Sequence, residues 1–252
     1  FHRVIARLDI KGPNLVKGIH LEGLRVLGSP KEFAEKYFFD GADELFYQDV
    51  VASLYNRNSI LKFISQTAET ISIPLTVGGG IRSTTDIKEA LEAGADKVAI
   101  NTAAIKNPEI IKESSRIFGS STIVASVEAI KSENGDYLAY TDNGREYTGI
   151  NVTRWCQELE KLGAGEILLT SIDHEGTGTG YDIDLINSVR NLVNIPIIAH
   201  GGFGNSNHII EAIKYGKANA VALASMLHYG SILDNNFSIK NNDEGNVSFL
   251  NS

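Results

Sequence analysis

Short apolar runs alternate along the chain with amphipathic segments that repeat their apolar residues at helical spacing. The apolar runs are rich in β-branched residues, which is typical of strand–helix units around a parallel sheet. The predicted strands are 4–9, 44–50, 73–77, 97–101, 121–128, 166–171, 195–200 and 218–224. The predicted helices begin near residues 29, 59, 83, 107, 151, 182, 205 and 225. The pattern therefore predicts an α/β protein.

Eight such units in 252 residues match a (β/α)8 TIM barrel, a fold of about 250 residues. A doubly wound parallel sheet is the alternative, although it more often has fewer strands. An internal repeat favours the barrel, since PLTVGGGIRSTTDIKEALEAG from Pro74 aligns with PIIAHGGFGNSNHIIEAIKYG from Pro196. The two segments begin 122 residues apart, which predicts a half-barrel internal duplication, because solenoid units span only about 20–50 residues. No linker divides the halves, so residues 1–252 are expected to form a single domain.

Three segments are less regular: residues 10–29, residues 131–149 and the polar tail from Asn235. The first two follow predicted strands and are interpreted as mobile lids, whereas the tail is interpreted as a poorly ordered end. The second segment contains YLAYTDNGREYTG, whose alternation predicts a β-hairpin with Asn143 and Gly144 at its turn. This hairpin is expected to lean over the barrel mouth.

Charge and cysteine content exclude several classes of function. The chain has 23 Lys and Arg against 31 Asp and Glu, a net charge of −8, without a basic block. This balance argues against a nucleic-acid or membrane partner. The single cysteine, Cys156, cannot form an internal disulfide, and no apolar run approaches the roughly 18 residues of a membrane span. The sequence predicts a soluble, cytoplasmic protein.

Glycine-rich turns at predicted strand ends suit anionic ligands. The turns and their polar neighbours fall into two groups, Gly78–Gly80 with Asn101 and Thr102, and Gly201–Gly202 with Gly176 and Ser225. Glycines allow backbone N–H groups to approach an oxyanion, and a helix N-terminus adds partial positive charge. Two groups related by the internal repeat predict a ligand with a phosphate at each end. Alternatively, the glycines only permit tight strand–helix turns.

Carboxylates also occupy predicted strand ends, where the active sites of barrels form. They are Asp9, Asp49, Glu128 and Asp173. Asp9 and Glu128 are expected on opposite sides of the barrel, where two carboxylates can divide general acid and base roles. The alternative is that they form ion pairs with cations such as Arg7 and Lys17.

The histidines show no metal-binding spacing. HExxH and comparable motifs are absent from the sequence, so no metal is expected. No organic cofactor is expected either, because acid–base groups such as these carboxylates can carry the chemistry alone. His174 and His200 follow or end predicted strands, where each either touches a ligand or plays a structural polar role.

Several motifs together resemble one known family. They are RLDI, NLVKG, GADEL, QDVVAS, LTVGGGIR, GADKVAINTAA, GAGEILLTSIDHEGTGTGYD and IPIIAHGGFGN, which span residues 4 to about 228 in order. The chain resembles the cyclase subunit of imidazole glycerol phosphate synthase, the HisF family. The resemblance implies a (β/α)8 barrel that receives ammonia from a glutaminase partner, HisH. It further implies that ammonia and the bisphosphate PRFAR yield imidazole glycerol phosphate and AICAR.

The resemblance also implies roles for individual residues. Asp9 matches the family's strand-one catalytic aspartate, and Lys17 matches a lysine that closes over substrate. The predicted substrate- and phosphate-binding residues are Lys17, Asp49, Gly80, Asn101, Thr102, Asp173, Gly176, Gly202 and Ser225. The residues matching a charged ammonia gate at the opposite end are Arg3, Glu44, Lys97 and Glu166, with Asp96 facing the partner. The alternative for the ring is a stability network, since the bottom face of a barrel usually serves stability.

The chain departs from the family pattern at the predicted site. Glu128 in SVEA stands where the second catalytic aspartate is usual, and Arg7 replaces a small residue. Glu175 replaces an aspartate, and the last helix is shortened. These departures motivate an alternative function, an ammonia conduit for a surface-polysaccharide sugar amidotransferase without cyclase activity. The sister isomerase of the preceding histidine-pathway step is a third, weaker alternative.

Overall fold

The structure, a computed structural model, describes residues 2–19, 22–50 and 58–233. The predicted polar tail from Asn235 lies outside these residues. Among the described helices, none is long and apolar enough to cross a membrane.

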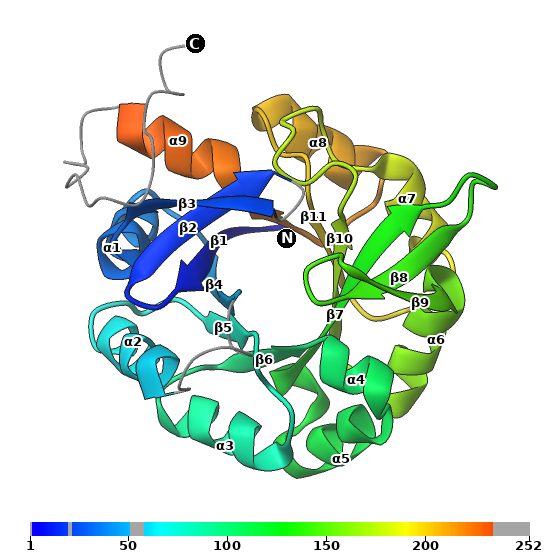
Figure 1. The fold of residues 1–252 in the computed structure, drawn as a ribbon, viewed down its shortest axis with the longest axis horizontal. Helices are drawn as coiled ribbons and strands as arrows, with labels where there is room; N and C mark the ends of the chain where they lie inside the picture. Colours follow the sequence, from blue (N-terminus) through cyan, green and yellow to red (C-terminus); the bar gives the residue numbers. More distant parts are fainter. Residues whose placement is uncertain (1, 20–21, 51–57, 234–252) are drawn as a thin grey trace.

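Eight parallel strands of the described residues close into a barrel (Figure 1). In order around the barrel they are β1 (Arg3–Lys11), β4 (Glu44–Asp49), β5 (Leu75–Gly78), β6 (Lys97–Ile100), β7 (Ile123–Lys131), β10 (Glu166–Ser171), β11 (Ile197–His200) and β12 (Ala220–Leu223). β12 pairs with β1, and β10 pairs with β7, so the ring closes without an edge. The predicted (β/α)8 fold is confirmed.

The helices surround this ring of strands in Figure 1. They are α1 (Pro30–Phe39), α2 (Asn58–Ala68), α3 (Thr84–Glu92), α4 (Thr102–Lys106), α5 (Glu109–Phe118), α6 (Val152–Leu162), α7 (Ile183–Arg190), α8 (Ser206–Lys214) and α9 (Ser225–Leu233), with a 3-10 turn η1 (Ser120–Thr122). Their starts agree with the prediction, except that the short α4 precedes α5. Local capping explains several starts, since Ser83 and Asp86 form a reciprocal capping box at α3.

The strands are apolar on both faces because two cores meet at them. Along β10, Leu168 points into the barrel interior, whereas Ile167 and Leu169 pack against the helices. The interior layer consists of Ile5, Phe46, Ala99, Val124, Leu168, Ile198, Ala220 and Ala222, all buried. Parallel strands covered on both faces read as continuous apolar runs, which is the pattern that the sequence shows.

Two antiparallel hairpins extend the barrel strands. Residues 10–29 were expected to be irregular, and this prediction is wrong. They contain β2 (Asn14–Ile19) and β3 (Glu22–Gly28), which continue from β1 by antiparallel pairing. The second hairpin, β8 (Tyr137–Thr141) and β9 (Glu146–Asn151), is confirmed. Its turn uses positive φ at Asn143 and Gly144, as the Asn-Gly pair predicts.

Candidate active site

A buried network of four charges lies where β1 ends. Asp9 accepts hydrogen bonds from Arg7 Nε at 2.9 Å and from Lys17 Nζ at 2.8 Å. Lys17, on β2, also pairs with Glu175 from the loop after β10. The two cations and two anions alternate, so their charges balance. Such balance is what allows four charges to be buried together, since an unpaired buried charge is costly.

This network controls the charge of Asp9, which is 1% exposed. Burial by itself would raise the pKa of Asp9, but Arg7 and Lys17 outweigh burial and hold that pKa well below its usual range. Asp9 is therefore an anion at neutral pH. The alternative that Asp9 pairs with Arg7 and Lys17 is confirmed by these contacts.

Glu128, three residues before the end of β7, occupies a different electrostatic environment. Burial raises its pKa to about 7, although a hydrogen bond from the Gly144 N–H at 2.8 Å opposes the shift. Gly144 belongs to the β8–β9 turn, and Asn143 of the same turn donates to the Val50 carbonyl at 3.4 Å. The hairpin thus leans over the barrel mouth, as predicted, and it holds the second carboxyl group.

A pocket of about 510 Å³ opens beside Glu128. It brings together five of the predicted site residues: Asp49, Gly80, Asn101, Thr102 and Glu128. Arg82 and Lys106 also line this pocket and add positive charge. Gly79 has φ +90° and packs against the Asp49 backbone so closely that a Cβ would collide with its carbonyl oxygen. The residues of the first predicted phosphate-binding site therefore line one concave pocket that also carries positive charge.

The second group of glycines lies on loops that touch one another. Gly180 N–H donates to the Gly202 carbonyl at 2.7 Å, which joins the loop after β10 to the loop after β11. Ser225 begins α9, and its buried hydroxyl has no hydrogen-bond partner within the described residues. A buried, unpaired hydroxyl at a helix N-terminus fits an anion that accepts a hydrogen bond from it.

We expect Gly202→Ala to destabilise the protein more than Gly41→Ala. Both glycines have positive φ, so each alanine costs at least about 1 kcal/mol of unfolding free energy. A Cβ at Gly202 would also collide with the Gly180 carbonyl oxygen, whereas nothing lies within 4 Å of one at Gly41. Urea unfolding of both variants measures the difference. Equal losses of unfolding free energy would show that the loop at Gly180 moves away from the added Cβ at little cost.

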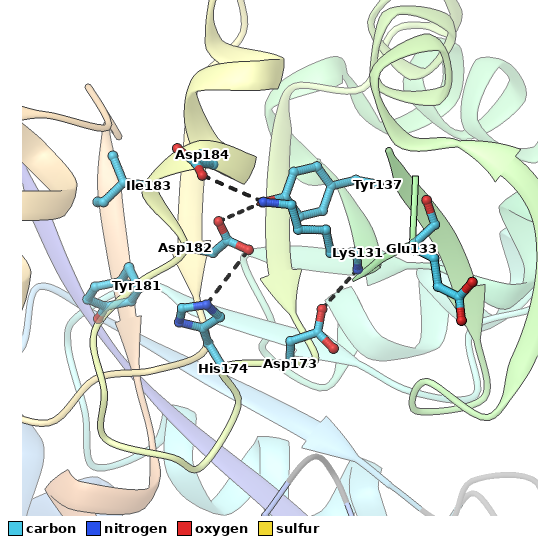
Figure 2. A pocket seen from close by; sticks show the side chains of 10 residues that line it. Lys131, Glu133, Tyr137, Asp173, His174, Tyr181, Asp182, Ile183 and Asp184 are labelled. Atoms are coloured by element: carbon cyan, nitrogen blue, oxygen red, sulfur yellow. Dashed lines mark hydrogen bonds and ion pairs between the residues drawn. The ribbon is translucent and has the colours of Figure 1, made fainter. Parts of the chain in front are cut away.

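Asp173 lies apart from the other predicted site residues. Its Oδ2 accepts from the Lys131 backbone N–H at 2.9 Å, which draws the side chain toward the end of β7. It lines a second pocket of about 630 Å³ with His174, Tyr137 and Asp182 (Figure 2). The two pockets share no lining residue.

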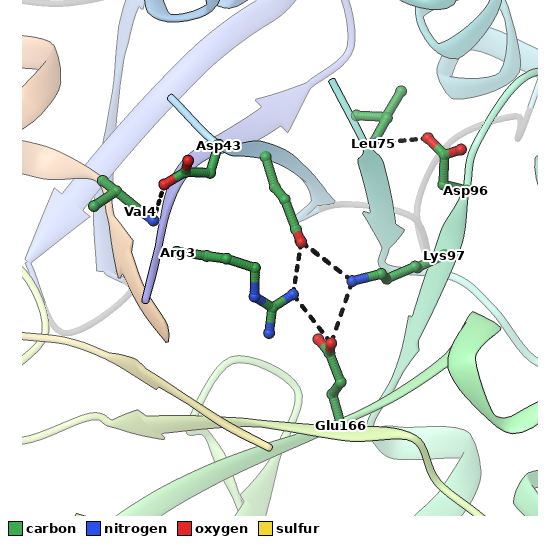
Figure 3. Close-up of polar contacts among 8 residues, drawn as sticks. Arg3, Val4, Asp43, Leu75, Asp96, Lys97 and Glu166 are labelled. Atoms are coloured by element: carbon green, nitrogen blue, oxygen red, sulfur yellow. Dashed lines mark hydrogen bonds and ion pairs between the residues drawn. The ribbon is translucent and has the colours of Figure 1, made fainter. Parts of the chain in front are cut away.

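The predicted charged ring is present at the amino-terminal end of the strands (Figure 3). Arg3 Nη1 contacts Glu44 Oε1 at 2.6 Å and Glu166 Oε1 at 3.0 Å, and Lys97 Nζ lies 3.3 Å from the same two atoms. Exposed Asp96 lies immediately before β6, where its Oδ2 accepts from the Leu75 N–H at 2.8 Å. The four charges form a closed ring of alternating sign, although Glu166 Oε2 is buried without a hydrogen-bond partner among the described residues.

We expect Lys97→Met to lower the unfolding free energy by about 1–3 kcal/mol, because Glu44 and Glu166 would then share only Arg3. The double variant Glu44→Gln/Lys97→Met should recover part of this loss, since Arg3 and Glu166 remain paired. Chemical denaturation of the single and double variants checks the expectation. An additive loss in the double variant would contradict it.

Three residues of the site were not among the predicted binding or catalytic residues. Glu175 was visible only as a departure from a family pattern. Arg7 was visible also as a candidate ion-pair partner of Asp9, and His200 as a strand-end histidine with either a ligand contact or a structural role. His200 Nδ1 lies 3.2 Å from Arg7 Nη1 and 3.1 Å from Thr170 Oγ1. Contacts between β1, β10 and β11 bring these groups together, and the separation in sequence hides that proximity.

Comparisons with known proteins place the chain in a family. The histidine biosynthesis protein family matches residues 3–233. The HisF subunit of imidazole glycerol phosphate synthase from Legionella pneumophila is 58% identical over 202 residues, 80% of this chain and 95% of the relative. The HisF subunits of Prochlorococcus marinus (strain AS9601) and Thermobifida fusca (strain YX) are 47% and 48% identical, covering 90% and 91% of this chain and 89% and 91% of the relatives. With its closed barrel and its polar strand ends, the chain therefore belongs to the HisF family, the cyclase subunits of imidazole glycerol phosphate synthase, and is an enzyme of histidine biosynthesis.

Proposed function

We propose that this chain adds ammonia to the bisphosphate PRFAR and forms imidazole glycerol phosphate and AICAR. The observation that carries the proposal is the opposite protonation of two carboxyl groups at barrel strand ends. Asp9 is held ionised by Arg7 and Lys17, whereas burial keeps Glu128 protonated up to about pH 7. Two carboxyl groups with pKa values driven apart are the arrangement that divides base and acid roles.

Each carboxyl group has a distinct role in this reaction. When ammonia adds to the carbonyl carbon of the substrate, its nitrogen becomes positively charged, and the Asp9 carboxylate stabilises that charge. Asp9 accepts the proton after Lys17 has moved away, because Lys17 is one of the two cations that hold its pKa low. Glu128 donates a proton to the group that leaves during ring closure and cleavage. Since Asp9 is covered by Lys17, substrate reaches it only when the β2–β3 hairpin shifts.

The two groups of glycines hold the two phosphates of the substrate. One phosphate binds in the pocket of Gly80, Asn101 and Thr102, beside Lys106. The other binds near Gly176, Gly202 and Ser225, where the unpaired Ser225 hydroxyl donates to a phosphate oxygen. Asp49 lines the first pocket and contacts the sugar portion of the substrate. Asp173 lines the second pocket and contacts the substrate from there.

Ammonia comes from a partner subunit. The relatives are named as subunits of a synthase, which implies a second subunit. We assign this role to a HisH-like glutaminase that docks on the amino-terminal face, beside exposed Asp96. The ring of Arg3, Glu44, Lys97 and Glu166 then forms the entry through which ammonia passes. We place this complex in the cytoplasm.

The experiment that tests the proposal is turnover of PRFAR by the isolated chain with excess ammonium salt at about pH 7, where part of Glu128 is still protonated. Formation of imidazole glycerol phosphate and AICAR at roughly 1 per second or somewhat below supports the cyclase. Binding of the bisphosphate without turnover would refute the acid and base roles. Absence of both binding and turnover would favour the ammonia-conduit alternative, for which the relatives provide no support.

A further inference from the structure

Arg7 spans the barrel interior between the apolar layer and the proposed catalytic end. Its Nε donates to Asp9, its Nη1 donates toward His200 Nδ1 at 3.2 Å, and its guanidinium carbon lies 5.6 Å above the Phe46 ring. Arg7 and His200 are both about 3% exposed. The histidine is therefore held by a cation in a region that water barely reaches.

The contact with Arg7 determines which nitrogen of His200 carries the proton. A guanidinium group only donates hydrogen bonds, so Nδ1 must be the acceptor, and a neutral imidazole then has its single proton on Nε2. The Thr170 hydroxyl lies on the same Nδ1 and can donate to it as well. Both protein contacts thus fall on one edge of the ring.

The charge of His200 is determined by its surroundings. Burial, followed by the charges of Arg7 and Lys17, lowers the pKa of His200 well below its usual range, and Asp9 opposes this effect. His200 therefore stays neutral at physiological pH. Its Nε2–H meets no hydrogen-bond partner in the part of the chain that the structure describes. Nε2 is not among the fully buried, unpaired side-chain atoms of the described residues, so it remains accessible, and a ligand oxygen can accept from it.

We infer that His200 is a further substrate-contacting residue, a neutral donor whose Nε2–H bonds an oxygen of the bound bisphosphate, and that Arg7 is the positioning residue that maintains this tautomer. The position supports the inference, since His200 ends β11 directly before Gly201 and Gly202. It also lies close enough to Asp9 for their charges to interact. The inference rests on the proposed function for the identity of the ligand.

Nitrogen-15 NMR of the full chain tests the tautomer independently of activity. His200→Phe identifies the His200 signals among those of the six histidines. We expect Nδ1 to be unprotonated and Nε2 protonated, without titration near pH 6.5. In Arg7→Met, a mixture of tautomers and a pKa closer to 6.5 should appear, because the donor and its charge are lost. Proton occupancy at Nδ1 in the unchanged protein, or an unaltered spectrum in Arg7→Met, would overturn the positioning role.

Two further measurements test the contact with substrate. Addition of PRFAR should shift the His200 Nε2 signal, and no shift despite binding would refute the contact. In turnover, His200→Phe should lower kcat/KM about 10–100-fold, whereas His200→Gln, which retains an N–H donor, should recover much of it. Exposed His2→Gln is the matched control. Equal activity of the Phe and Gln variants would also overturn the inference, whereas an inactive unchanged protein would refute only the proposed function.

Discussion

Asp9→Asn is expected to lower cyclase turnover about 1,000-fold and to destabilise the fold at the same time. Acid–base groups contribute about 100- to 10,000-fold to rates, and asparagine cannot accept the proton of the adding ammonia. The same substitution leaves Arg7 and Lys17 with Glu175 as the remaining anion of the network. Because a buried uncompensated charge costs about 3–5 kcal/mol, the unfolding free energy should fall by a similar amount.

The double variant Asp9→Asn/Arg7→Met separates the two effects. It removes one anion and the cation that pairs with it, while Lys17 stays paired with Glu175, so stability should largely return. Turnover should stay low, because the carboxylate is still missing. Steady-state kinetics with ammonium salt and urea unfolding measure both quantities. If the single variant remained fully active, the assignment of Asp9 would be refuted.

Turnover of the unchanged protein is expected to fall about tenfold per pH unit above roughly pH 7, at a constant concentration of free ammonia. Burial raises the pKa of Glu128 to about 7, and only the protonated form can donate a proton. Glu128→Gln should be about 100-fold slower at pH 6, and its rate should not follow this pH dependence. A rate that instead rises through pH 7 would show that Glu128 acts as the base.

Stability provides a second measure of the same group. In the unfolded chain Glu128 ionises near pH 4.5, whereas in the folded protein it stays neutral up to about pH 7. The stability that Glu128 contributes to the free energy of unfolding, relative to Glu128→Gln, is therefore complete below about pH 4.5. It declines as the pH rises to about 7. The total decline is about 3 kcal/mol at most. Parallel denaturation curves of both proteins between pH 4 and pH 8 check this difference.

Periodicity and local chemistry in the sequence were sufficient to predict the barrel. The strands are buried on both faces, so their apolar runs are continuous, and the repeat around Pro74 and Pro196 indicates two related halves. The turn at Asn143 and Gly144 was also predictable, because the required positive φ favours these residues. In contrast, the β2–β3 hairpin was missed, although Gly12 and Pro13 mark the tight turn across which Lys11 of β1 pairs with Asn14 of β2.

Sequence position alone identified Asp9 and Glu128 as carboxylates at strand ends, but it did not reveal their charges. Those charges depend on contacts between distant segments: Lys17 and Glu175 surround one group, and the Gly144 turn covers the other. Asp173 likewise turns into a separate pocket because the Lys131 backbone binds it. Strand periodicity is encoded by neighbours along the chain, whereas burial and charge pairing are set by residues that become neighbours only after the barrel closes.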